Sequence, residues 1–275
     1  MTSISQQMQK ISSEDRLGLM THIVIGYPDL KQSKDLVLEM AGAGVDFIEL
    51  QIPFTDPIAD GPTIMQASTT ALQNGIDTEQ CFEVMRELSC QTDIPLLFMT
   101  YYNIVHSCGP LTFCKKAAEA GAKGLIVPDM PLEEEQFEGF YKAAEATSMP
   151  IICVLAPENS ESRLREISAS SDSILYLPSR TGVTGARSEL MQHLRSEVAK
   201  IKGTTNQPVA VGFGVSSGHH IEIIRQANAD IAVVGSAVID QFARDGLHGV
   251  REFLSELTRA CNLRTAQSAV SGNAE

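Results

Sequence analysis

Short apolar runs alternate with longer amphipathic segments along the whole chain, and this alternation constrains the fold more than any other feature. The runs are nearly continuous and rich in β-branched residues, which is typical of parallel strands buried on both faces. They predict a parallel sheet with helices packed on it. The predicted strands lie at residues 20–26, 47–52, 95–101, 124–127, 150–155, 173–177, 208–212 and 231–235.

Helical segments lie between the predicted strands, where apolar residues recur at the spacing of one helix face. They fall at residues 33–43, 78–89, 111–120, 133–146, 160–168, 189–201, 218–226 and 247–263, and residues 4–12 predict an extra helix ahead of the first strand. Eight strand–helix units predict a (β/α)8 TIM barrel, a fold that typically needs ~250 residues. A doubly wound open sheet is the main alternative, but the glycine fingerprint expected after its first strand is missing.

A weak internal repeat supports this division of the chain. Three segments share the order of a helix end, small residues and then a strand, at residues 41–50, 118–129 and 225–237. Within them, Gly44, Gly121 and Asn228 suit the left-handed conformation that ends many helices. No linker rich in Pro, Gly or Ser divides the chain, so we expect one catalytic domain over residues 1–264 and a disordered tail over residues 265–275.

The balance of charge restricts the partners of the chain. It has 21 basic and 34 acidic residues and a formal net charge of −13. Such a charge argues against a nucleic-acid partner and against an anionic membrane surface. The longest strongly apolar run, near residues 231–239, is far shorter than the ~20 residues of a spanning helix, and the polar N-terminal segment lacks the apolar region of a signal peptide. We therefore expect a cytoplasmic protein.

Cysteine and histidine spacing argues against metal chemistry. The six cysteines form no Cys-x-x-Cys pair, and the six histidines show no spacing typical of metal ligands. We expect neither a disulfide framework nor a metal site.

Acidic residues gather where the second predicted strand ends, at the end of a TIM barrel that carries active sites. Glu49 lies inside an apolar run, and strand alternation directs it away from Ile48 and Leu50, toward the barrel mouth. Asp56 and Asp60 follow on a proline-rich loop. A carboxyl group withdrawn from water has a raised pKa, so Glu49 and a loop Asp form a candidate acid–base pair. The alternatives are an interior Glu paired with a barrel neighbour, and loop Asp residues that only stabilise turns.

Glycine-rich turns follow the seventh and eighth predicted strands. Gly212, Gly214 and Ser216 lie in the first turn, and Gly235 and Ser236 lie in the second. In TIM barrels these two loops recurrently bind phosphate through backbone N–H groups at helix N-termini, which requires no lysine. We therefore predict a phosphorylated substrate, with glycine that serves only the tight turns as the alternative.

A third glycine-rich segment, residues 179–187, follows the sixth predicted strand and indicates a mobile lid, with an ordinary surface loop as the alternative. No lysine lies at the carboxyl end of any predicted strand, which argues against a Schiff base or a pyridoxal site in this chain. What remains is acid–base chemistry by carboxylates, without a metal or a cofactor, on a small phosphorylated substrate.

Residues 49–64, ELQIPFTDPIADGPTI, closely resemble the signature of the tryptophan synthase α subunit. The similarity spans roughly residues 15–260 and keeps the order of the family's motifs, with further matches at residues 101–103, 125–131, 179–185, 212–216 and 235–236. This resemblance implies the retro-aldol cleavage of indole-3-glycerol phosphate to indole and glyceraldehyde 3-phosphate.

The resemblance also implies roles for individual residues. It makes Glu49 the group that protonates indole C3 and takes the proton of the glycerol hydroxyl, and Asp60 the acceptor of the indole N–H. Thr184 in the lid would hydrogen-bond Asp60 on closure. The implied phosphate-binding residues are Gly185, Gly214, Gly235 and Ser236, and the implied pocket positions are His22, Tyr101, Tyr176 and Phe213.

A partner is implied as well. The family's α subunit docks onto a β subunit in an αββα assembly, and indole passes between them through a tunnel. Pro53, Asp56 and Asn103 match interface positions on the α side. Pyridoxal phosphate is expected in the β partner, and no cofactor is expected in this chain.

The chain departs from the family at several positions. It has His22 where an aromatic or other apolar residue is usual, Gln51 where glycine is usual, Tyr27 where aspartate is usual, and Pro178 in place of an apolar residue. By alternation Gln51 shares a strand face with Glu49, within reach of a hydrogen bond to that carboxylate. Two other functions stay open: a sugar-phosphate isomerase with the same phosphate site, and an α-like chain that mainly activates a β partner.

Overall fold

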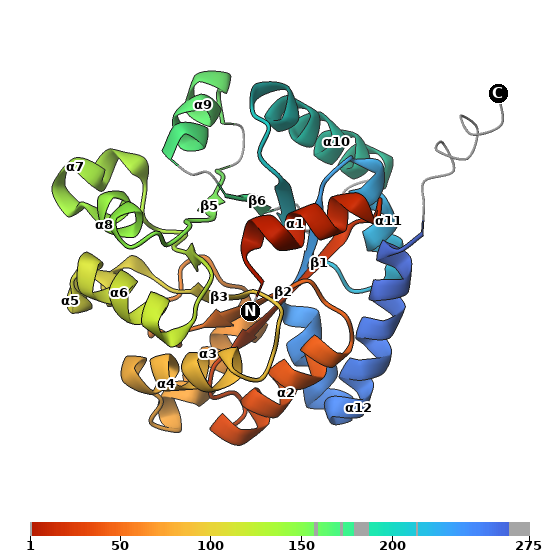
Figure 1. The fold of residues 1–275 in the computed structure, drawn as a ribbon. Coiled ribbons are helices and arrows are strands. Elements are labelled where there is room, and N and C mark those ends of the chain that lie inside the picture. Colours follow the sequence, from red (N-terminus) through yellow and green to blue (C-terminus); the bar gives the residue numbers. More distant parts are fainter. Residues whose placement is uncertain (1, 157–158, 171–172, 179–186, 213, 264–275) are drawn as a thin grey trace, which may run out of the picture.

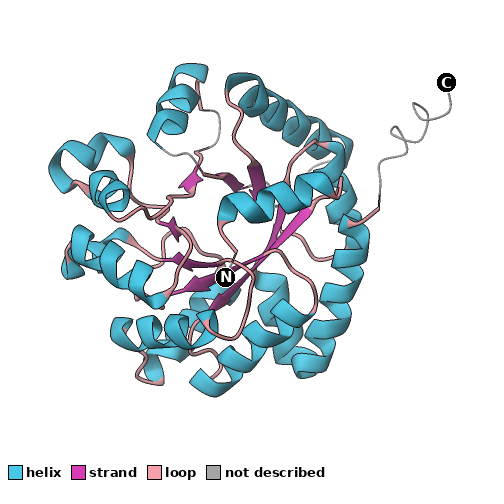
Figure 2. Cartoon of the chain, viewed as in Figure 1, coloured by secondary structure: helices cyan, strands magenta, loops and turns pink. Residues whose placement is uncertain are grey.

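The computed structural model describes residues 2–156, 159–170, 173–178, 187–212 and 214–263. Within these ranges, eight parallel strands form a ring with helices outside it (Figure 1, Figure 2). They follow one another in the order β4-β3-β2-β1-β8-β7-β6-β5, and a bridge between Leu125 and Ile151 joins the two ends. The predicted (β/α)8 barrel is confirmed. The strands are β1 (Gly18–Val24), β2 (Phe47–Gln51), β3 (Leu96–Met99), β4 (Leu125–Ile126), β5 (Cys153–Val154), β6 (Leu175–Pro178), β7 (Val209–Gly212) and β8 (Ile231–Val234).

Most helices lie where the sequence predicts them, and the extra N-terminal helix is confirmed as α1. Gly44, Gly121 and Asn228, which follow α2, α6 and α11, have positive φ angles of 85°, 98° and 65°, as their predicted role at helix ends requires. The helices are α1 (Ile4–Ser13), α2 (Leu30–Gly42), α3 (Pro62–Gln73), α4 (Thr78–Ser89), α5 (Tyr102–Cys108), α6 (Pro110–Ala120), α7 (Glu135–Glu138), α8 (Phe140–Ala146), α9 (Glu161–Ser170), α10 (Arg187–Thr204), α11 (Gly218–Gln226) and α12 (Ser236–Cys261), with a 3-10 turn η1 at Leu132–Glu134.

Some element boundaries differ from the prediction for local reasons. The predicted helix at residues 133–146 is interrupted at Gly139, whose φ of +65° separates α7 from α8. The predicted helix at residues 247–263 is the second part of α12, which already begins at Ser236. The sequence pattern does not predict α3, because its first turn lies in the proline-rich segment after β2. Pro62 occupies the start of that helix, where a missing N–H costs no hydrogen bond.

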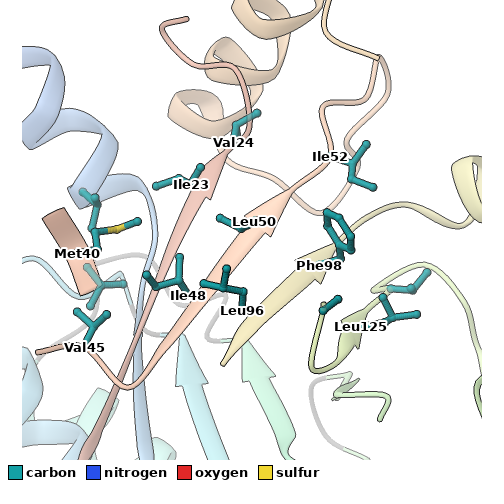
Figure 3. Packing of buried hydrophobic residues seen from close by; sticks show 14 of the residues in the cluster. Ile23, Val24, Met40, Val45, Ile48, Leu50, Ile52, Leu96, Phe98 and Leu125 are labelled. Carbon is teal, nitrogen blue, oxygen red and sulfur yellow. The ribbon is translucent and has the colours of Figure 1, made fainter. Parts of the chain in front are cut away.

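Apolar side chains form two layers, one between strands and helices and one inside the ring. On β2, Ile48 and Leu50 belong to the outer layer, which includes residues of α2 such as Met40 (Figure 3). Phe47 belongs to the cluster inside the ring. Because side chains alternate along a strand, Glu49 shares the inward face with Phe47.

Helix α1 closes the amino end of the barrel. It lies across the ring in the view of Figure 1, and its residues Ile4 and Ile11 belong to the interior apolar cluster. A Cβ atom at Gly18 would lie 2.9 Å from Cδ1 of Ile11, so the glycine lets β1 approach the helix closely.

Asp46 anchors this end of the barrel through four hydrogen bonds. Its carboxylate accepts from Gln7 Nε2 at 2.6 Å, from the two terminal nitrogens of Arg16 at 2.7 and 2.8 Å, and from the N–H of Leu19 at 2.9 Å. Asp46 is 2% exposed. Its buried charge is therefore paired and hydrogen-bonded, which is the condition under which burial of a charge is tolerated.

No helix in the described part of the chain has the length and apolar character needed to cross a lipid bilayer. The expected tail, residues 265–275, lies outside the described residues, and the domain boundary at residue 264 stays a prediction.

Candidate active site

Glu49 lies inside the barrel beside His22 of the neighbouring strand, on the face that strand alternation predicts. The parallel register of β1 and β2 sets these two residues opposite each other. Nδ1 of His22 is 3.0 Å from Oε2 of Glu49, and the side chains are 5% and 2% exposed. The two groups form a buried pair toward the carboxyl end of their strands.

The pKa of His22 lies above its usual value. Burial alone lowers it, because burial disfavours the charged imidazolium. The hydrogen bond and the charge of Glu49 raise it, and the charge of Asp60 adds to that effect. The imidazole therefore keeps its proton to a higher pH than a free histidine does.

Asp60 lies on the loop between β2 and α3 and reaches the same site. Its Oδ2 accepts a hydrogen bond from Nε2 of Gln51 at 2.7 Å. Burial raises the pKa of Asp60, against the opposing effects of the Gln51 hydrogen bond, the charge of His22 and a hydrogen bond from Tyr101. Gln51 thus binds Asp60 rather than Glu49, because side chains two residues apart on one strand stand side by side and do not point at each other.

Two tyrosines, Tyr101 and Tyr176, contact different elements around the site. Tyr101 is fully buried, its hydroxyl oxygen accepts from the N–H of Ala59 at 3.1 Å, and its ring stacks on Phe54 with centroids 5.3 Å apart. Tyr176 of β6 lies against β7, since a Cβ atom at Gly212 would be 2.8 Å from its hydroxyl oxygen. Glycine at that position leaves room for the phenol ring.

The pKa of Tyr176 is held well above its usual value, first by burial and then by the charges of Glu49 and Asp60. This coupling across the barrel places Tyr176 in the same site as the two carboxylates. Its phenol stays protonated at neutral pH, so it is available as a hydrogen-bond donor.

The turns after β7 and β8 both lead into helices. Gly235 precedes α12, where no side chain caps the first N–H groups, and a Cβ atom there would lie 3.7 Å from Cβ of His22. The free helix terminus thus lies beside the carboxylate site. At α11, by contrast, the N–H of Gly218 already donates to a carboxylate oxygen of Glu256 at 3.2 Å. The start of α12 is therefore the better anion site of the two.

Several predicted site residues fall outside the described part of the chain, namely Thr184, Gly185 and Phe213. Gly214 is described and exposed, with a φ of +60°. Ser236 is the first residue of α12. Among the described residues, no group of three or more His, Cys, Asp or Glu side chains is placed to hold a metal ion.

The residues matched to a partner interface lie outside this cluster. Asp56 is exposed on the loop after β2, and Asn103 is exposed in the first turn of α5. Pro53 is buried in the isolated chain. Ile58, on the same loop as Asp56, has a side chain that is 82% exposed, an unusual degree for a large apolar residue.

Three buried polar atoms at the site have no hydrogen-bond partner within the described residues: Oε1 of Glu49, Nε2 of His22 and Oε1 of Gln51. Buried polar groups are paired in most proteins, and exceptions gather at sites where a ligand binds or reacts. The sequence allowed a barrel neighbour as a partner for Glu49, and the structure confirms such a partner. Sequence reasoning did not identify this neighbour as His22. The signal for this contact is that both polar residues occupy inward positions of adjacent apolar strands.

Comparisons with known proteins agree with this geometry. The family model of the tryptophan synthase alpha chain matches residues 8–268. A tryptophan synthase alpha chain of Prochlorococcus marinus is 39% identical over 265 residues, covering 95% of this chain and 99% of the relative. One of Desulforapulum autotrophicum is 41% identical over 239 residues, covering 87% and 93%.

Solved structures give the same result. A chain of tryptophan synthase from Mycobacterium tuberculosis matches with a TM-score of 0.86 and 28% identity, covering 96% of this chain and all of the other. A tryptophan synthase alpha-subunit mutant from Pyrococcus furiosus matches with a TM-score of 0.80 and 29% identity, covering 89% and 99%. With eight strands in the same ring and a matched family over nearly its whole length, this chain belongs to the tryptophan synthase alpha chain family.

Proposed function

We propose that the chain is a carbon–carbon lyase that cleaves indole-3-glycerol phosphate to indole and glyceraldehyde 3-phosphate, as the α subunit of a tryptophan synthase. The observation that carries the proposal is the pair of carboxyl groups at the barrel mouth, the buried Glu49 on β2 and the half-buried Asp60 on the following loop. They are connected to one cluster through His22 and Gln51. The family of the chain supports the same reaction.

In this mechanism Glu49 and Asp60 move protons, without a metal or a cofactor in this chain. Protonated Glu49 donates its proton to C3 of the indole ring while Asp60 accepts the proton of the ring N–H, which gives an indolenine. The glycerol hydroxyl then returns a proton to Glu49, its O–H electrons form the aldehyde C=O, and the C–C bond breaks. The electrons of that bond restore the indole ring, whose nitrogen recovers its proton from Asp60. All protons are conserved, and the two carboxyl groups return to their starting states.

The remaining site residues hold the substrate. Tyr101 and Tyr176 border the carboxylates, and with Phe213 they form the walls of the indole pocket. The N–H groups at Gly235 and Ser236, at the uncapped start of α12, bind the phosphate together with Gly214 and Gly185. Thr184, in the segment after β6, donates to Asp60 when substrate is bound.

The indole product is consumed by a partner, a tryptophan synthase β subunit that carries pyridoxal phosphate, in a cytoplasmic αββα assembly. The exposed loop after β2, with Asp56 and Ile58, and the exposed start of α5, with Asn103, are the surfaces that we assign to this contact, with Pro53 supporting the loop from within. Solved structures of tryptophan synthase complexes from other organisms support a partner of this kind.

The test is steady-state release of indole from indole-3-glycerol phosphate, with the chain alone and with a β subunit. We expect indole in both arms, faster with the partner. A sugar-phosphate isomerase releases none in either arm, although it binds the phosphate. A chain that only activates its partner releases none alone but increases tryptophan formation from added indole by the β subunit.

A further inference from the structure

The barrel mouth holds a histidine whose position the reaction itself does not explain. His22 and Glu49 lie opposite each other in the β1–β2 register, 3.0 Å apart between Nδ1 and Oε2. Both side chains are at least nine-tenths buried. A Glu carboxylate only accepts hydrogen bonds, so Nδ1 is the donor whenever Glu49 is ionised.

We propose that His22 is a positioning residue for Glu49, which fixes the carboxylate through Oε2 and leaves Oε1 free to exchange protons with the substrate. This inference rests on the proposed lyase function. The hydrogen bond uses one carboxylate oxygen, and within the described residues the other has no partner. A carboxylate held on one side exposes a single oxygen in a single orientation, which is what proton transfer to a fixed ring carbon requires.

The surroundings of His22 keep this hydrogen bond charge-assisted. The titratable groups that face it are Glu49 on β2, Asp60 on the following loop and Tyr176 on β6, while β8 presents apolar residues and Gly235. Because the pKa of His22 is raised, the imidazolium persists to a higher pH than in a free histidine, and its charge is lost as the pH rises through that pKa. The neutral imidazole still donates through Nδ1. However, the hydrogen bond is then no longer charge-assisted and holds the Glu49 carboxylate less firmly.

The proposed proton transfers use only Glu49 and Asp60, so they assign His22 no proton of its own. The same cluster contains a parallel arrangement, in which Nε2 of Gln51 donates to Oδ2 of Asp60 at 2.7 Å. Each of the two carboxyl groups therefore accepts a hydrogen bond from an inward side chain of β1 or β2. A purely structural role would predict a fully paired histidine, whereas Nε2 of His22 lacks a partner among the described residues.

Two substitutions separate positioning from packing. His22→Phe keeps the ring volume but removes the donor, and His22→Asn keeps a donor near the place of Nδ1 but cannot titrate. We expect His22→Phe to lower kcat for indole release roughly ten-fold, the worth of one hydrogen bond to a charged group, with KM within about two-fold. His22→Asn should recover most of kcat but lose the alkaline limb of the wild-type pH profile.

The matched control is His248→Asn. His248 also lies beside a glutamate, with Nε2 3.4 Å from Glu252 Oε1, but on the exposed surface of α12. It should leave kcat and the pH profile unchanged. The proposal is overturned if His22→Phe and His22→Asn both keep the wild-type kcat and pH profile, or if both lose kcat equally with the profile unchanged, since either result leaves no role for the donor.

A second measurement needs no substrate and so stands apart from the lyase proposal. In an NMR titration of the imidazole resonances, His22 should titrate above the usual pKa of a histidine side chain in the wild-type chain. In Glu49→Gln the pKa of His22 should fall, because the carboxylate charge is gone. An unchanged His22 titration in Glu49→Gln would refute the pair, whereas absence of indole release by the wild type with an intact titration would refute only the lyase function.

Discussion

Two buried carboxylates near β2, Asp46 and Glu49, are three residues apart in sequence and lie in opposite environments. Asp46, at the amino end of the barrel, accepts four hydrogen bonds, two of them from Arg16. Glu49, toward the carboxyl end, has one partner, His22, and one oxygen without a partner in the described residues. Both residues are 2% exposed, so burial alone does not distinguish them.

The difference lies in how completely each charge is satisfied. A saturated carboxylate stabilises the fold and has no capacity left for a ligand, whereas an incompletely paired one retains that capacity at some expense in stability. This matches the division of labour in TIM barrels, in which the amino end serves stability and the carboxyl end serves catalysis. The predictions below test that division by changing one end at a time.

The largest expected effect is on catalysis by Glu49→Gln. The amide fills the same space but cannot transfer protons, so kcat for indole release should fall by about 10²–10⁴-fold. The melting temperature of Glu49→Gln should stay at the wild-type value, because the amide keeps the side-chain volume and a hydrogen bond to His22. Calorimetry and an indole assay measure the two quantities, and retained turnover would remove Glu49 from its proposed role.

Asp46→Asn should show the opposite behaviour. The change removes the buried charge that pairs with Arg16, so that the more exposed Glu14 is the acidic partner that remains. We expect a loss of about 3 kcal/mol in the free energy of unfolding. The kcat per folded molecule should be unchanged. Urea unfolding measures the free energy of unfolding, and an activity assay with an active-site titration measures kcat per folded molecule. A fall in kcat with normal stability would contradict the assignment of stability to the amino end and catalysis to the carboxyl end of the barrel.

Gln51→Leu probes the second carboxylate of the mouth. Without the Gln51 hydrogen bond, which lowers the pKa of Asp60, that pKa rises further above its ordinary value. Asp60 must be ionised to accept the indole proton and loses that charge as the pH falls, so the acid limb of kcat/KM should move to higher pH. We expect roughly a ten-fold loss in kcat/KM near neutral pH.

The control for this variant is Thr63→Val, which removes an exposed hydrogen bond to another carboxylate, that of Asp240 at 3.2 Å. It should leave the acid limb where the wild type has it. An acid limb in Gln51→Leu that stays at the wild-type position would show that Gln51 does not influence the ionisation of Asp60.

The smallest effect is expected for Lys202→Met. Lys202 pairs with Asp230 Oδ1 at 2.8 Å, but both side chains are more than one quarter exposed. Such a pair contributes at most about 1 kcal/mol to the free energy of unfolding. Chemical denaturation of the variant measures this value. A loss as large as that of Asp46→Asn would mean that the number of hydrogen bonds to a buried carboxylate contributes less to stability than we infer.

The sequence predicts the barrel well because its strongest signal is local. Buried parallel strands need nearly continuous apolar runs, and the segments around Ile48 and Val211 satisfy that need without any knowledge of the partner strands. Strand alternation also gives the direction of Glu49, since the period of two follows from backbone geometry alone. The left-handed helix end at Gly44 is predictable for the same reason.

The contacts of the site are less predictable because they depend on register. Nothing local pairs His22 with Glu49; the contact exists because β1 and β2 align these two positions. Gln51 illustrates why strand alternation alone does not predict hydrogen-bond partners. Its position on β2 suggests Glu49 as the partner, but Gln51 donates to Asp60, nine residues later on the following loop. Helix α3 is missed for a related reason, as proline marks both loops and helix starts.

The closure of the ring has a consequence for how the chain opens and assembles. β1 and β8 join the two halves of the sequence along a ladder from Gly18 and Ile231 to Thr21 and Val234, whereas β4 and β5 meet only near the bridge between Leu125 and Ile151. The two halves of the chain therefore pair extensively between β1 and β8 but only through a short contact between β4 and β5. Amide protons near the β4–β5 contact should exchange with solvent before those of the β1–β8 ladder. The chain should best tolerate a backbone cut or new termini between β4 and β5.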